Sequence, residues 1–226
     1  MTITYFGHSA IQAETDGPTL LFDPHLSGNP HTEADPASLS PDVVLLTHAH
    51  FDHYGDTEAI LQNTGSLLIA QFEIMVYVQQ QIEHETFQPM NTGGTATFDW
   101  GRVTNTHARH SSSFADGTYG GLAGGFVVEL DGLTIFNSGD TALFSEMADI
   151  GDRFDIDVAF LPVGDVLTMG PDDAVRAAQM LRPTLSIPVH WGTFPFFTGT
   201  PEAFVEKMRA AGMDARHLAP GDTLDV

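Results

Sequence analysis

The sequence predicts an α/β domain with two β-sheets, and three observations favour this class. Residues 41–46 and 157–163 are apolar runs of β-branched and aliphatic side chains, typical of strands buried on both faces. Segments with helical character, such as 55–61 and 172–181, follow these runs. The 226 residues can bury a sizeable core and contain no stretch that resembles a linker. We therefore expect a single domain over residues 1–226.

The first half of the chain is expected to form one sheet. The Asp-Gly-Pro turn signal at 16–18 joins two of its strands, so the first strands should form an antiparallel meander. The predicted strands of this half are 3–6, 10–14, 19–23, 41–46 and 66–70. Residues 72–81 should form a helix, whereas 26–40 are rich in Ser, Gly, Asn, Pro and acids and should form a surface loop.

The second half is expected to form another sheet, followed by a closing helix and two edge strands. An Asp-Gly pair at 131–132, between two apolar runs, predicts a β-hairpin. Helices are expected at 172–181, where apolar residues recur at helical spacing, and at 201–211. The predicted strands are 93–98, 102–108, 126–130, 133–137, 157–163 and 183–190, with edge strands at 215–218 and 223–226.

The composition limits the classes of ligand and compartment. The chain has no cysteine, so disulfides and thiolate ligands are excluded and a metal site must use nitrogen and oxygen donors. Thirty acidic residues oppose eight basic ones, which disfavours binding to nucleic acid or to an anionic membrane. No apolar stretch approaches the ~20 residues of a membrane span, and the N-terminus lacks signal-peptide features, so we expect a cytoplasmic protein. A cell with high internal salt, typical of a halophile, would explain the acidic surface, because screening relieves the self-repulsion.

The densest group of candidate ligands is Thr-His-Ala-His-Phe-Asp-His at 47–53, which begins where a buried strand ends. Residues i and i+2 of an extended segment point the same way, so His48 and His50 can converge on one ion. Asp52 and His53 follow on the turn and should face a second, neighbouring position. Imidazoles with carboxylates suit zinc first, with manganese or iron as alternatives. The competing interpretation is a set of solvated loop histidines, which this spacing disfavours.

Other strand ends carry further candidates. Either His107 or His110 could be a ligand, and His110 is favoured because it lies nearest the point where strand gives way to loop. Asp140 follows an apolar strand and could bridge two cations, or it could cap a helix. His190 ends the strand predicted before it. Asp23 ends a buried strand before a proline, where it could orient a metal-binding imidazole or simply occupy a turn.

The residues around two of these ligands are candidates for a substrate pocket. Trp191, Phe194 and Phe196 should line the pocket that His190 faces, with core packing as the competing interpretation. Arg109 is the one basic residue beside a candidate ligand and is assigned to the same pocket.

With these residues in place, the sequence resembles a metallo-β-lactamase-fold hydrolase. The His-x-His-x-Asp-His motif stands at 48–53, and the later motifs follow in the expected order. The resemblance covers essentially the whole chain and implies a four-layer αββα sandwich, two mixed β-sheets flanked by helices. Four segments of this sequence resemble a compact branch of the superfamily. That branch is related to the ascorbate-phosphate lactonase and the N-acyl-phosphatidylethanolamine phospholipase D. These segments are 6–9, 22–24, 110–112 and 190–195.

The resemblance also implies roles for individual residues. Two divalent ions, bridged by Asp140, would share a water that acts as hydroxide on a small ester, lactone, amide or phosphodiester. Asp52 would transfer a proton, His8 would contact the substrate or donate a proton, and Asp23 would support a ligand from behind. The implied ligands are His48, His50 and His110 for the first ion and Asp52, His53 and His190 for the second.

Two other functions are left open by the sequence. Mononuclear-iron dioxygenases of the same fold share the first motif, and a metal-binding or sensing domain without turnover could keep the ligands. Nuclease members of the superfamily need a basic platform, which this acidic chain lacks. We therefore expect a small-molecule substrate and no nucleic-acid or membrane partner, with homo-oligomerisation left open.

Overall fold

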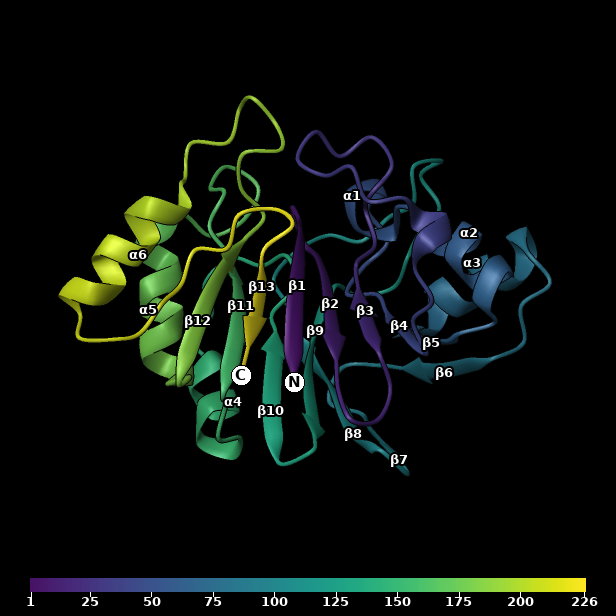
Figure 1. The fold of residues 1–226 in the computed structure, drawn as a ribbon, viewed down its shortest axis with the longest axis horizontal. Helices are drawn as coiled ribbons and strands as arrows, with labels where there is room; N and C mark the ends of the chain where they lie inside the picture. The colour runs from purple at the N-terminus through teal and green to yellow at the C-terminus, as the bar shows by residue number, and fades with distance from the viewer.

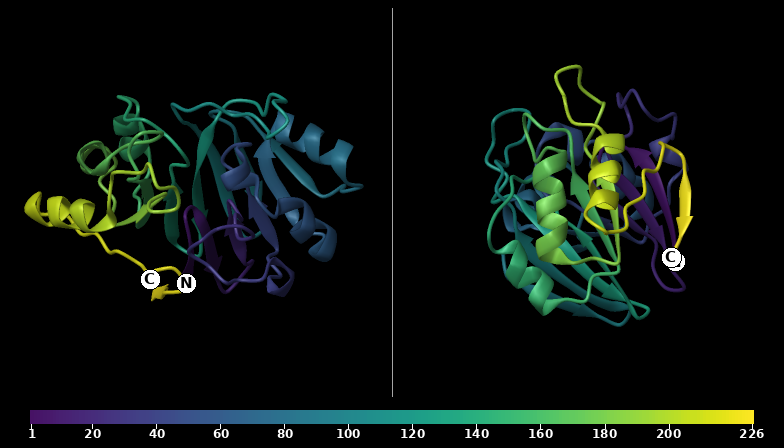
Figure 2. Two further views of the ribbon diagram at one scale, coloured as in Figure 1. Left: turned by 90° about the horizontal axis from the view of Figure 1, so that it is seen from above. Right: turned by 90° about the vertical axis from the view of Figure 1, so that its left-hand side faces the viewer.

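The computed structural model describes residues 1–226, and its first sheet has seven strands (Figure 1). Strands β1 to β3 pair antiparallel, which confirms the predicted meander, and β3 to β6 pair parallel. The last strand, β13, pairs antiparallel with β1 and brings the two termini side by side (Figure 2). In spatial order the strands are β13 (Thr223–Asp225), β1 (Thr2–Gly7), β2 (Ala10–Glu14), β3 (Leu20–Phe22), β4 (Val43–Leu45), β5 (Leu67–Gln71) and β6 (Phe87–Met90).

The second sheet has six strands and also mixes antiparallel and parallel pairs. Its order is β12 (Leu185–Val189), β11 (Val158–Pro162), β10 (Leu133–Asn137), β9 (Gly124–Leu130), β8 (Gly101–His107) and β7 (Thr95–Phe98). The predicted hairpin is confirmed between β9 and β10, where Asp131 and Gly132 have φ values of 52° and 79°. Two positive φ values are what a type I′ turn requires. Strands β10, β11 and β12 are parallel, so their carboxyl ends lie at one edge.

Helices cover the outer face of each sheet and complete the four layers. Beside the first sheet lie α1 (Phe51–Tyr54), α2 (Thr57–Thr64) and α3 (Phe72–Gln81). Beside the second lie α4 (Met147–Arg153), α5 (Pro171–Leu181) and α6 (Pro201–Ala210). The predicted αββα architecture is therefore confirmed. None of these helices combines the length and the apolar character that crossing a membrane demands.

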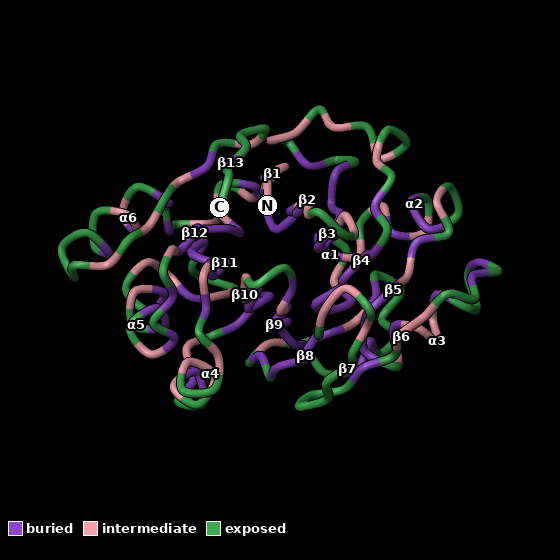
Figure 3. Tube along the Cα trace, turned by 60° about the horizontal axis from the view of Figure 1, so that its bottom comes forward, coloured by how far each residue is buried: buried purple, intermediate pink, exposed green.

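The alternation of side chains along β4 explains its unbroken apolar sequence. Val43 and Leu45 pack into the core between the two sheets, whereas Val44 and Leu46 pack beneath α2 and α3. Figure 3 shows the burial along the whole chain, with the central strands mostly buried and the connecting turns mostly exposed. A strand covered on both faces has no position at which a polar side chain reaches water.

Two sheet edges differ from the predictions. The strand expected at 215–218 is absent: Ala215 makes only an isolated bridge to Ser186, and Leu218 then packs into the core. A strand that was not predicted, β6, closes the other end of the first sheet. It contains Pro89, and proline is tolerated in sheets mainly at such edges, which masks the strand in sequence.

The segment after β10 also differs from the prediction. No helix starts at Asp140, because residues 141–146 form a loop and α4 begins only at Met147. The helix-capping interpretation of Asp140 is therefore wrong. Helix α4 was not predicted, since it is one of the shorter helices and contains Gly151, a poor helix former.

The acidic surface leads to an expectation about salt. Few of the thirty acidic side chains have a cationic partner, and the exposed pairs include Arg182 with Asp152 and Lys207 with Asp172. Because unpaired carboxylates repel one another and salt screens that repulsion, we expect the thermal unfolding midpoint to rise from low to molar KCl. A midpoint that stays constant across this range would contradict the expectation.

Candidate metal centre

Loops at one edge of the two sheets bring the candidate ligands together. His8 follows β1, His48 and His50 follow β4, Asp140 follows β10 and His190 follows β12, while His110 lies between β8 and β9. Asp52 and His53, expected on a turn, lie instead in the short helix α1. These loops are drawn above the strand ends in Figure 1. The edge at which parallel strands end is the usual place for a ligand in α/β sheets.

Three histidines form the first group of donor atoms. Nδ1 of His50 lies 3.0 Å from Nε2 of His48 and 3.2 Å from Nε2 of His110. The donor atoms of the group all lie within 4.8 Å of one another. His48 is buried, and the other two are partly exposed. One ion could therefore contact all three imidazoles from the open side.

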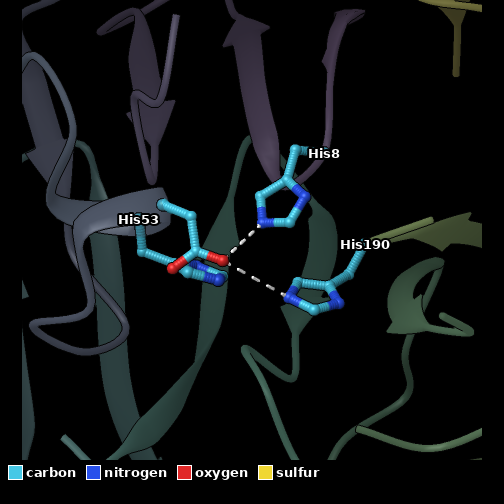
Figure 4. A group of neighbouring side chains, drawn as sticks. His8, His53 and His190 are labelled. Atoms are coloured by element: carbon cyan, nitrogen blue, oxygen red, sulfur yellow. Dashed lines mark hydrogen bonds and ion pairs between the residues drawn. The ribbon is translucent and has the colours of Figure 1, made fainter. Parts of the chain in front are cut away.

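A second group contains Asp52, His53, His190 and His8, whose donor atoms also lie within 4.8 Å of one another. All four side chains are buried. Oδ2 of Asp52 lies 3.1 Å from Nε2 of His8 and 3.8 Å from Nε2 of His190. In Figure 4, dashed lines join one carboxylate oxygen of this group to the rings of His8 and His190, and His53 lies beside them.

Asp140 stands at the boundary of the two groups. Its Oδ2 lies 2.9 Å from Nε2 of His190 and 3.3 Å from Nε2 of His53, both in the second group. The same oxygen lies 3.6 Å from Nε2 of His110 and 4.0 Å from Nε2 of His48, in the first group. A single carboxylate is thus close to both groups of donors.

The donor set fits metal ions. Oδ1 of Asp140 has no hydrogen-bond partner, and Nε2 of His53 and Nε2 of His190 make no hydrogen bond although the Asp140 carboxylate lies close to both. Buried polar atoms nearly always have a partner in folded proteins, so converging unpartnered donors call for one. Imidazole nitrogen and carboxylate oxygen are the donors that zinc and related divalent ions prefer.

Burial and mutual charge set the protonation states. Burial lowers the pKa of His48 well below its ordinary value, and the neighbouring His53 lowers it further. Burial alone would raise the pKa of Asp140, but His190 and His53 outweigh it and hold that pKa well below its ordinary value. Neutral imidazole and ionised carboxylate are the forms that bind a metal.

Asp23 lies behind His53 and is fully buried. Its Oδ2 accepts hydrogen bonds from Nδ1 of His53 at 2.8 Å and from Oγ1 of Thr47 at 2.7 Å, and its Oδ1 accepts from the Thr47 amide at 2.9 Å. Burial lowers the pKa of His53, but Asp140 and Asp23 outweigh it and raise that pKa well above its ordinary value. The sequence analysis gave Thr47 no role. The only feature of the sequence that points to one is its position directly before His48.

His8 is held through both ring nitrogens. Nε2 faces Asp52, and Nδ1 lies 2.8 Å from Oγ1 of Thr193. Burial, followed by the charge of His190, lowers the pKa of His8 to about 3, so the ring is neutral near pH 7. Thr193 was given no role of its own from the sequence, although it lies in the segment 190–195 that carries the family resemblance.

Three site residues have an unusual backbone conformation. His8, Asp23 and His190 have φ values of 55°, 43° and 55°. Positive φ is uncommon outside glycine and persists where the surrounding structure requires it. Each of the three directly follows a strand. The side chains of His8 and His190 belong to the second donor group, and that of Asp23 contacts His53.

A cleft of about 430 Å³ opens above the ligands. Phe194 and Phe196 lie on its wall together with Phe51 and Leu167. Leu167 belongs to the loop after β11, which the sequence did not connect with the site.

Two residues predicted for this pocket lie elsewhere. Nε1 of Trp191 donates to the carbonyl of Pro188 at 3.1 Å, and the ring packs against Tyr5 in the core. The core-packing interpretation thus applies to this one aromatic residue. Arg109 does not line the cleft; its amide donates to Oγ1 of Thr141 at 3.0 Å.

Comparisons with known proteins identify the family. A family profile described as the beta-lactamase superfamily domain matches residues 2–190. A UPF0173 metal-dependent hydrolase of Salinibacter ruber is 52% identical over 223 residues, which cover 99% of each chain. A UPF0173 metal-dependent hydrolase of Thermus thermophilus is 44% identical over 223 residues, covering 98% of this chain and 97% of that relative.

Solved structures share the fold. Igni18, a metallo hydrolase from the archaeon Ignicoccus hospitalis, is 35% identical with a TM-score of 0.90, covering 99% of this chain and 97% of that chain. An isothiocyanate hydrolase from Delia radicum gut bacteria is 22% identical with a TM-score of 0.80, covering 100% and 99% of the two chains, and supports the fold alone. From the domain match and the full-length relatives, the chain belongs to the UPF0173 metal-dependent hydrolases of the metallo-β-lactamase superfamily.

Proposed function

We propose that this hydrolase uses two divalent metal ions, zinc first with manganese or iron as alternatives, to cleave a small ester, lactone, amide or phosphodiester. One observation carries the proposal: Oδ2 of Asp140 lies 2.9–4.0 Å from histidines of both donor groups. A carboxylate between two groups of donors is well placed to bridge two neighbouring cations, as in two-metal hydrolytic sites.

Each donor group would hold one of the two ions. Two such ions, when bound, supply an acidified water and polarise the bond to be broken. Asp23 would orient His53 by accepting from Nδ1, and Nε2 would face an ion once it gives up the proton that the raised pKa of His53 holds there. The proposed ligands are His48, His50 and His110 for one ion, Asp52, His53 and His190 for the other, and Asp140 for both.

We assign proton transfer to Asp52. It lines the cleft, so it can reach both water and substrate. Burial alone would raise its pKa, but the hydrogen bond from His8 and the charge of His53 lower the pKa below its ordinary value, so the carboxylate is ionised at neutral pH, the form that a proton acceptor must have. His8 is fully buried and does not line the cleft, which favours a positioning role through Asp52 over direct contact with substrate.

Replacing His8 by alanine should lower kcat about 10- to 100-fold with little change in KM, because Asp52 would lose the group that orients it. His8→Gln, whose amide can still donate to the carboxylate, should retain more activity. Steady-state kinetics with metal content measured on each variant separates positioning from loss of an ion. Full turnover in His8→Ala would show that His8 has only a packing role.

The other two functions have less support. A mononuclear-iron dioxygenase needs one group of donors, and a sensing domain has no need of a proton-transfer carboxylate facing a cleft. The second group, with Asp23 supporting His53 and His8 supporting Asp52, favours hydrolysis.

A chelation and reconstitution experiment tests the proposed function. Protein stripped with EDTA and reloaded with zinc, manganese or iron is assayed on 4-nitrophenyl acetate, γ-butyrolactone, acetanilide and bis(4-nitrophenyl) phosphate. We expect chelation to abolish hydrolysis of at least one substrate and a divalent ion to restore it. Oxygen consumption by the iron form alone would favour the dioxygenase, and no turnover by any loaded form would favour the sensing domain.

A further inference from the structure

Large apolar side chains gather at the mouth of the metal site. Phe51, Leu167 and Phe196 are 57%, 50% and 50% exposed, and all three line the cleft above the ligands. Phe194 completes the wall. Single exposed apolar residues are common and need no explanation, but a cluster around a concave site indicates contact with a ligand.

Ring contacts hold this apolar rim in place. The rings of Phe194 and Phe196 stack with centroids 5.5 Å apart and an interplanar angle of 1°. Phe51 meets Phe194 at 6.0 Å and 67°, close to an edge-to-face arrangement. Phe51 belongs to α1 and the other two to the loop after β12, so the contacts join segments from the two sheets.

Leu167 reaches the cleft from a strained loop. Asp165 and Val166 have φ values of 64° and 59°, and the left-handed region is unusual above all for a β-branched residue. The Asp165 carboxylate stabilises the loop, since Oδ1 accepts from the Val166 amide at 2.8 Å and Oδ2 from Oγ1 of Thr198 at 2.9 Å. The hydrogen bond from Thr198 joins this loop to the loop after β12, which carries Phe194 and Phe196. Such strain persists where a particular geometry is needed.

The rim carries no positive charge. None of the eight basic side chains of the protein lines the cleft. The net charge of −22 further disfavours the approach of anions. A phosphodiester is anionic at neutral pH, and proteins usually recognise such groups with Arg or Lys. Apart from the ions of the proposed centre, which would also polarise an uncharged carbonyl, the cleft offers no such cation. The cleft therefore suits an uncharged group better than a phosphate.

We infer that the rim of Phe51, Leu167 and Phe196 binds the uncharged apolar substituent of an ester, lactone or amide, an aliphatic chain or an aromatic ring. The inference rests on the proposed hydrolase function and narrows it by setting phosphodiesters aside. The bond to be cleaved lies at the inner end of the cleft, beside Asp52 and Asp140. Selectivity then comes from burial of apolar area, which is non-directional and favours length over a particular shape.

A series of 4-nitrophenyl esters from ethanoate to octanoate tests the inference kinetically, since the leaving group stays constant. We expect kcat/KM to rise about fourfold per methylene until the cleft is filled, the factor that corresponds to ~0.8 kcal/mol per buried CH₂. Leu167→Ala and Phe196→Ala should flatten this dependence. Phe72→Ala is the matched control, because Phe72 is 51% exposed on α3 but does not line the cleft. A flat series in the wild type, equal slopes in all variants, or faster cleavage of bis(4-nitrophenyl) phosphate than of every ester would overturn the inference.

A binding measurement on the metal-free protein decides the inference without turnover. Saturation-transfer NMR with 2-octanone, a neutral apolar ketone, should report binding to the wild type and to Phe72→Ala, and weaker binding to Leu167→Ala and Phe196→Ala. Equal binding to all four proteins, or binding to none, would contradict it. The two proposals can fail separately. If no substrate is hydrolysed but 2-octanone still binds in a way that depends on Leu167 and Phe196, the hydrolase proposal is contradicted and the apolar binding site is supported.

Discussion

Asp140→Asn should lower kcat/KM about a thousandfold while leaving the protein folded. The amide has the shape of the carboxylate but lacks its charge, so it cannot offset the repulsion between two neighbouring cations. Loss of several kcal/mol of charge stabilisation at such a site corresponds to a rate factor of about 10³. Steady-state kinetics on metal-loaded protein, with circular dichroism to confirm folding, measures the effect.

A matched control keeps this result specific. Asp155→Asn makes the same change at an exposed position between α4 and the start of β11, the opposite end of that strand from the ligand loops, and should leave kcat/KM unchanged. If Asp140→Asn kept near wild-type activity, Asp140 would not be the shared ligand.

Asp23→Ala should weaken both the fold and the metal site. It leaves the Thr47 amide, the Thr47 hydroxyl and Nδ1 of His53 without their acceptor in a fully buried place. Removing one partner of a buried charged pair costs about 3–5 kcal/mol of unfolding free energy. Release of the His53 ring should also lower metal affinity about 10- to 100-fold. Urea unfolding of the chelated protein and a metal-competition titration give the two values.

Two companion variants separate these effects. Asp42→Ala removes a carboxylate that accepts from the Thr19 amide at 2.8 Å on the surface, and it should cost about 1 kcal/mol or less without changing metal affinity. Asp23→Asn keeps an acceptor for Thr47 but puts a competing donor toward His53, so it should keep more stability than Asp23→Ala while still losing affinity. Unchanged metal affinity in both Asp23 variants would contradict the orienting role.

Local patterns were enough to predict much of the fold. The apolar run at 41–46 predicted a strand covered on both faces because alternate side chains pack into two different cores. The Asp-Gly pair at 131–132 predicted a hairpin because both residues accept the positive φ that the turn needs. The sequence failed where a local pattern conflicts with the structure, as at Pro89 in β6 and Gly151 in α4.

In the candidate site, too, local patterns predicted some residues and left others undecided. The spacing of His48, His50 and His53 predicted that they act together. In the structure they lie close to His110 and His190, which follow distant strands. Sequence alone could not exclude a helix cap at Asp140, because capping and metal binding use the same side chain at the same kind of strand end.

The pocket was harder to predict because it depends on backbone direction. Positive φ at His190 sets where the following residues go, and it sends Trp191 into the core while Phe194 and Phe196 reach the cleft. Leu167 arrives from another loop through the strained residues Asp165 and Val166. No sequence pattern carries that information, since it arises from contacts between loops that are far apart in the chain.

Metal content per chain, measured by inductively coupled plasma mass spectrometry, tests the two-ion centre most directly. Protein purified without added metal is compared with His110→Ala and His190→Ala, which remove one donor from the first and the second group respectively. We predict about two divalent ions per wild-type chain and about one in each variant, since each change weakens a single position. One ion per wild-type chain that both variants lose would contradict the two-ion centre and point to a mononuclear site.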